Sequence, residues 1–75
     1  MAFETFSTND LVRIATAGGG FRLNAAGRLT DDLVRIAAAS SVHNSRLTLS
    51  GVVGRSIEDL VRIGAAGKGS VFFEG

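Results

Sequence analysis

The chain has 75 residues, no cysteine, and a net charge of +1 from eight cations and seven anions, which allows one small domain and excludes disulfides, thiolate metal sites and thiol nucleophiles. No apolar run approaches the roughly 18 to 20 residues of a membrane span, and the first ten residues carry Glu4 but no lysine or arginine, so we expect no signal peptide, no membrane partner and a cytoplasmic location. The isoelectric point of about 8.5 lies below the value of roughly 9 that is typical of nucleic-acid-binding modules, so composition gives such a role little support.

An internal repeat organises the chain. The tetrapeptide Leu-Val-Arg-Ile occurs three times, at residues 11–14, 33–36 and 60–63, each time after an aspartate and before a run of small residues. Residues 27–32 also match residues 54–59. We therefore interpret residues 1–75 as a single domain of three internal repeats, at about 7–28, 29–53 and 54–75.

The first repeat predicts a helix followed by a strand, after an opening strand at residues 2–6. Ser7 and Asp10 have the spacing of a capping box and predict the start of a helix. Apolar residues around Leu11 share one face of that helix, whereas Arg13 points away from it. Gly18 then predicts the end of the helix, and the alternation at residues 21–24 predicts a strand.

The second and third repeats predict the same order of elements. Leu29 occupies the place of Ser7, so we expect Thr30 to cap the second helix, which is followed by a strand at residues 46–50. Gly51 marks a bulge or the end of that strand. Ser56 predicts the third cap, Gly67 the end of the third helix, and residues 71–74 the last strand.

Alternating strands and helices predict an α/β fold of three short helix-plus-strand repeats, with a mainly parallel sheet in two layers. An antiparallel sheet formed by exchange between subunits would show the same periodicities. The repeat length falls within the range of leucine-rich repeats. The asparagine-bearing consensus of that family is missing, so the analogy concerns architecture only.

Size and apolar content together favour self-association. Leucine, isoleucine, valine and phenylalanine supply 23 of the 75 residues, above the fraction of about 20% below which chains tend to be disordered. A domain this short buries only about 60% of the surface that its unfolded chain exposes, so a monomer would be marginally stable. The last strand carries Phe72 and Phe73 and ends in an unprotected edge. We therefore expect a homo-oligomer that uses these residues as an association edge.

The repeated arginines Arg13, Arg35 and Arg62 are the strongest candidates for a functional face. If the three helices pack side by side, their guanidinium groups form a row on the outer face that could meet an acidic protein partner or phosphates. The alternative, which we favour, is that each arginine pairs with the aspartate three residues before it on its own helix. Such pairs contribute only about 0.2 to 0.5 kcal/mol each and would neutralise the row.

Other candidate sites lack the required pattern. Residues 64–70 resemble a phosphate-binding loop, but Gly69 separates Lys68 from Ser70 and a helix precedes the loop, so we reject it. His43 is the only histidine, and no nearby residue would orient its ring for catalysis. We interpret Arg28 and Arg55, which precede the second and third helices, as part of the turn and cap rather than as an anion site. We expect no catalytic residue, metal or cofactor.

These observations favour a small non-enzymatic protein–protein interaction or self-assembly module built from α/β repeats. The alternative is a small regulatory protein that binds nucleic acid through the row of repeated arginines. An enzyme whose site is completed between subunits is disfavoured by the lack of a catalytic set.

Overall fold

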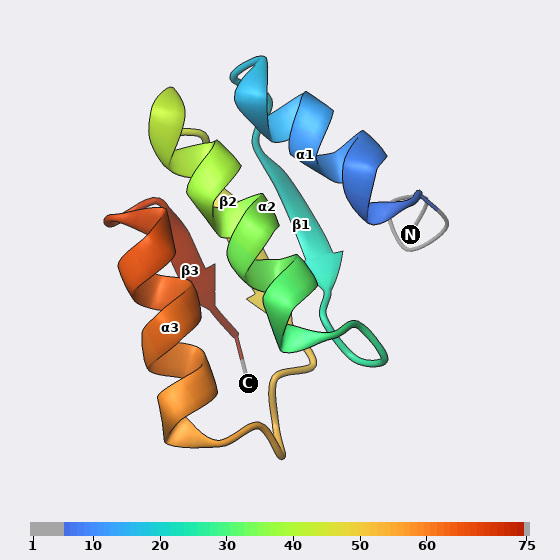
Figure 1. Ribbon diagram of the computed structural model, residues 1–75, viewed down its shortest axis with the longest axis vertical. Helices are drawn as coiled ribbons and strands as arrows, with labels where there is room; N and C mark the ends of the chain where they lie inside the picture. Colours follow the sequence, from blue (N-terminus) through green and yellow to red (C-terminus); the bar gives the residue numbers. More distant parts are fainter. Residues whose placement is uncertain (1–5, 75) are drawn as a thin grey trace.

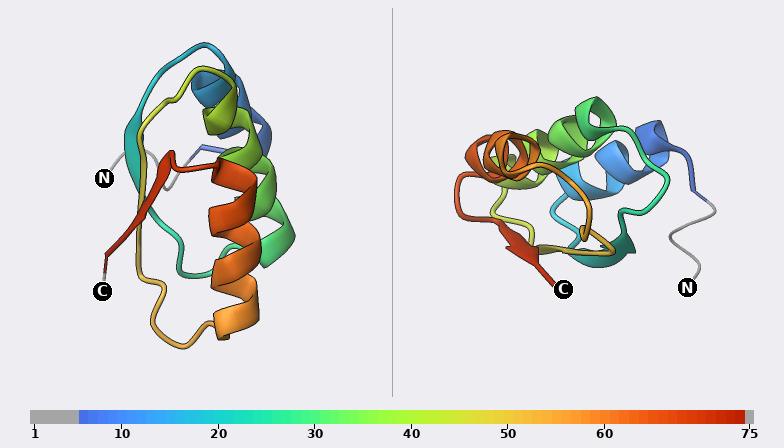
Figure 2. Two further views of the ribbon diagram at one scale, coloured as in Figure 1. Left: turned by 90° about the vertical axis from the view of Figure 1, so that its left-hand side faces the viewer. Right: turned by 90° about the horizontal axis from the view of Figure 1, so that it is seen from below.

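The structure, a computed structural model, describes residues 6–74. Helices and strands alternate, in the order α1 (Thr8–Thr16), β1 (Phe21–Asn24), α2 (Thr30–Val42), β2 (Leu47–Ser50), α3 (Ile57–Gly67) and β3 (Val71–Phe73). The three helices cover one face of the sheet (Figure 2). The predicted α/β class in two layers is therefore confirmed. Of the expected opening strand, Phe6 is not in a strand and residues 2–5 lie outside the described residues.

The three strands form one parallel sheet in the order β1-β2-β3. The register aligns Phe21 with Leu47 and Val71, and Leu23 with Leu49 and Phe73. α2 and α3 each carry the chain back to the end of the sheet where the previous strand began, and such a crossover makes neighbouring strands parallel. The structure thus has parallel pairing within one chain and no antiparallel exchange among the described residues.

The core lies between the sheet and the helices. Alternate residues of β1 and β2 point towards the helices and are buried, as are the apolar residues of the helices that face them. The largest fully buried side chains include Leu11, Leu33 and Ile63 from the helices and Leu23, Leu47 and Leu49 from the strands. Burying each contributes about 1.5 to 3 kcal/mol to folding. The leucine of the repeated tetrapeptide therefore anchors α1 and α2 to the sheet, and its isoleucine anchors α2 and α3.

Serine caps begin two of the three helices. Ser7 and Ser56 each accept a hydrogen bond from the backbone N–H three residues on, at 3.2 Å, which confirms the predicted serine caps. The prediction that Thr30 caps α2 is wrong, because Leu29 holds the cap position and makes no side-chain hydrogen bond there. The cap position of α2 is therefore the one that aligns with Ser7 and Ser56, although the nearest hydroxyl belongs to Thr30.

Glycine has two different roles at the helix ends. Gly18 follows α1 with a φ of +99°, a left-handed conformation that favours glycine, as predicted. α3 ends at Gly67, as predicted, but the left-handed conformation that follows the helix belongs to Lys68. A Cβ atom at Gly67 would collide with the side chain of Val71, so close packing against β3 requires glycine there.

Candidate protein-interaction surfaces

Side-by-side packing of the helices sets the partners of the repeated arginines. α2 lies between α1 and α3 (Figure 1). Arg35 donates a hydrogen bond to Asn9 Oδ1 on α1 at 2.8 Å, and Arg62 pairs with Asp31 Oδ1 on α2 at 2.7 Å. The interpretation that each arginine pairs with the aspartate on its own helix is therefore wrong for these two. Their partners belong to the preceding helix.

Arg28 and Arg55 also reach back to the preceding helix. Arg55 donates from Nη1 to Thr30 Oγ1 at 3.0 Å, and from Nη2 to the carbonyl oxygens of Arg28 and Ala25 at 2.6 and 2.8 Å. Arg28 donates in the same way to Thr8 Oγ1 at 3.4 Å and to the carbonyl oxygen of Phe6 at 2.8 Å. Each of these arginines thus ties the turn before its own helix to the start of the previous helix through its Nη groups. The Nε of Arg55 is buried without a hydrogen-bond partner.

α3 carries different residues at the places that accept these bonds. When the three Leu-Val-Arg-Ile copies are aligned, Thr8 and Thr30 correspond to Ile57. Asn9 and Asp31 likewise correspond to Glu58. Both Ile57 and Glu58 are exposed. No helix follows α3 within the described part of the chain, so no arginine from a later helix bonds Ile57 or Glu58 there.

One side of α3 is apolar and only partly covered by the rest of the fold. Its residues recur at the i, i+3, i+4 and i+7 positions of a single helix face and are Ile57, Leu60, Val61 and Gly64, here named the α3 stripe. Ile57 is 68% exposed and Val61 is 61% exposed. On α2 the corresponding side faces α3: Thr30 contacts Arg55, and Ala37 is fully buried beside Gly67.

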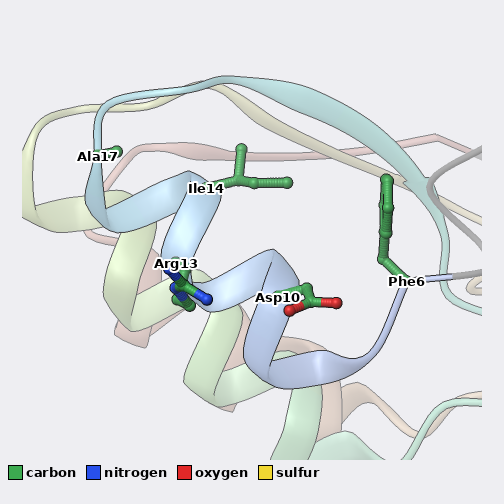
Figure 3. A pocket seen from close by; sticks show the side chains of 5 residues that line it. All are labelled: Phe6, Asp10, Arg13, Ile14 and Ala17. Atoms are coloured by element: carbon green, nitrogen blue, oxygen red, sulfur yellow. The ribbon is translucent and has the colours of Figure 1, made fainter.

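The side of α1 that faces away from α2 is hollowed. Asp10, Arg13, Ile14 and Ala17 have the same helical spacing and, together with Phe6, line a hollow of about 400 Å³ (Figure 3). These four helix residues are here named the α1 stripe. Within residues 6–74, the Arg13 guanidinium has no hydrogen-bond or ion-pair partner. The corresponding isoleucines of α2 and α3, Ile36 and Ile63, are fully buried, whereas Ile14 is half-buried.

The predicted association edge divides between the two faces of the sheet. Phe73 points to the helix side, where its ring lies next to Gly64 of α3. Phe72 points to the open side, where the Arg46 guanidinium lies 4.6 Å from the centre of its ring. Arg22 of β1 and Glu74 form an ion pair that joins the two edges of this open side. Both phenylalanines keep exposed ring surface, so their role in association stays a prediction.

Sequence reasoning missed the α3 stripe. The available signal was the change from threonine at positions 8 and 30 to isoleucine at position 57, once the three Leu-Val-Arg-Ile copies are aligned.

Residues 6–74 contain no cluster of three metal-ligating side chains and no helix that is long and apolar enough to cross a membrane.

Comparison with known proteins finds no matching family model, no similar curated protein and no similar solved structure.

Proposed function

We propose that the protein is a non-enzymatic protein–protein interaction and self-assembly module in which three α/β repeats stack side by side. The observation that carries this proposal is the α3 stripe. It presents an apolar helix side that, on α2, is covered by the next helix. Contiguous exposed apolar surface on a small domain marks an interaction site.

The size of the domain supports the same proposal. A chain of 75 residues buries a small fraction of its surface, so covering the α3 stripe would add stability that the monomer lacks. Nucleic-acid binding by the arginine row has weaker support. Arg62 is already neutralised by Asp31, and Arg35 is engaged by Asn9.

Replacing Val61 with aspartate tests the α3 stripe. A charge in the centre of an apolar contact would have to be desolvated, so we expect Val61→Asp to weaken association at least about tenfold. Light scattering after size exclusion measures this as a fall in mass towards 7.8 kDa. Refractive index must detect the protein because it contains no tryptophan or tyrosine.

Val53→Asp is the matched control. Val53 is 83% exposed, lies in the turn after β2 and is not part of the α3 stripe, so this variant should keep the wild-type mass. A wild-type protein that is monomeric at every concentration, or a Val61→Asp variant that associates like the wild type, would refute the proposal.

A further inference from the structure

We propose that the partner of the α3 stripe is the α1 stripe of a second copy of this chain, so that copies associate head to tail. This inference rests on the proposed function and names the occupant of its surface. In such a contact, α3 of one copy packs against α1 of the next copy. The packing is the same as that of α1 against α2 and of α2 against α3 within one chain. Three independent correspondences between the two ends support it.

The first correspondence is geometric. The α1 and α3 stripes are the two sides of one kind of helix–helix contact, and α2 has both of its sides covered by its neighbours. On α2, Thr30 and Ala37 face α3, whereas Arg35 faces α1. The hollow beside Ile14 lies where a preceding helix would pack, and its volume of about 400 Å³ suits side chains such as Ile57 and Val61.

The second correspondence is electrostatic. Arg35 bonds Asn9, and Arg62 bonds Asp31, in each case across one helix–helix contact. The next pair in this series joins Arg13 of one copy to Glu58 of another copy. Both side chains are exposed, and neither has a hydrogen-bond or ion-pair partner within the described part of its own chain.

The third correspondence is a joint change from polar to apolar residues. Inside the chain, arginine at position 28 or 55 bonds the threonine at the start of the preceding helix. At the two ends, Phe6 takes the place of the arginine and Ile57 takes the place of the threonine. A head-to-tail contact brings these two apolar residues together, and Phe6, which is 40% exposed, already lines the hollow on α1.

This contact uses two different surfaces, so it does not terminate at a dimer. Such heterologous contacts continue until a ring closes or a filament forms. The mass measured by light scattering should therefore rise with protein concentration beyond that of a dimer, to a plateau if a ring closes and without a plateau if a filament forms. A two-fold contact between two α3 stripes would instead stop at twice 7.8 kDa.

Charge reversal tests the pairing directly. Arg13→Glu places two glutamates across the contact, and Glu58→Arg places two arginines there, so each variant alone should associate roughly three- to tenfold more weakly than the wild type. An equimolar mixture of the two variants restores opposite charges at every contact. We expect its association constant to return to within about twofold of the wild type.

The double variant Arg13→Glu with Glu58→Arg adds a stricter test. It should associate with itself like the wild type but should not co-assemble with wild-type chains, because mixed contacts would oppose like charges. Lys68→Glu is the control, since it reverses the charge of an exposed residue outside both stripes and should leave association unchanged. Circular dichroism of each variant confirms that the fold is kept.

The outcomes separate this inference from the proposed function. If Val61→Asp disperses the protein but mixing the two charge variants restores nothing, or the mass stops at a dimer, the head-to-tail contact is refuted and the interaction surface stands. If the wild type is monomeric throughout, both are refuted. Rescue by mixing, together with a mass that grows with concentration, establishes the contact.

Discussion

Arginine side chains join neighbouring helices at four places in the described part of the chain, through Arg28, Arg35, Arg55 and Arg62. The Arg55 guanidinium bonds the Thr30 hydroxyl and two carbonyl oxygens in the turn before α2, those of Ala25 and Arg28. A planar fork with several donors suits this task, whereas a lysine ammonium is a single point.

Arg55→Lys should therefore lower the free energy of unfolding by about 1 to 3 kcal/mol, because charge-assisted hydrogen bonds to partly buried groups are lost. Urea denaturation followed by circular dichroism measures the change. Arg13→Lys is the matched control, since the Arg13 guanidinium has no partner within residues 6–74 and its replacement should leave the stability of the monomer unchanged. Equal unfolding free energies for both variants would contradict this role of Arg55.

At the scale of the elements, α2 begins without the cap that its two neighbours have. The backbone of Leu29, with φ of −71° and ψ of 146°, closely matches that of the capping residues Ser7 and Ser56. The Leu29 side chain is 70% exposed and contributes little to the core. The backbone at position 29 therefore already has the conformation of a helix cap, but the leucine side chain has no oxygen that could accept the capping hydrogen bond.

Leu29→Ser should raise the free energy of unfolding by about 0.5 to 1 kcal/mol, since the hydroxyl would accept a bond from the Asp32 backbone N–H. The shift of the urea midpoint measures this gain. Leu29→Ala removes the same apolar surface without adding an acceptor, so it serves as the control. A serine variant no more stable than the alanine variant would show that the cap position of α2 is not limiting.

At the scale of the whole molecule, we expect stability to depend on association, because a domain this small buries little of its surface. A protein that associates only when folded is stabilised by mass action as its concentration rises. We expect the thermal midpoint of the wild type to rise by about 5 °C or more over a hundredfold increase in concentration. The midpoint of Val61→Asp should stay constant over the same range. A wild-type midpoint independent of concentration would argue against assembly.

The sequence by itself determined the α/β class, the alternation of helices and strands and the two serine caps. These features depend on local spacing, because a helix face recurs every 3.6 residues, a strand face every two, and a cap bonds within three residues. The predicted strands at residues 46–50 and 71–74 each exceed the observed strand by one residue. The extra residues, Arg46 and Glu74, still make one backbone hydrogen bond each to a neighbouring strand, so the difference is only in where the paired ladder ends.

Only the tertiary structure decided the partners of the arginines and the surfaces left uncovered. Local spacing offers Arg62 the aspartate on its own helix, but packing brings Asp31 of α2 within 2.7 Å. Likewise, Val61 has the same tetrapeptide around it as Val34, yet it is more exposed because α3 has no following helix among the described residues. Contacts between residues about 30 positions apart exist only once the helices lie side by side, so identical sequence motifs acquire different partners and different exposure.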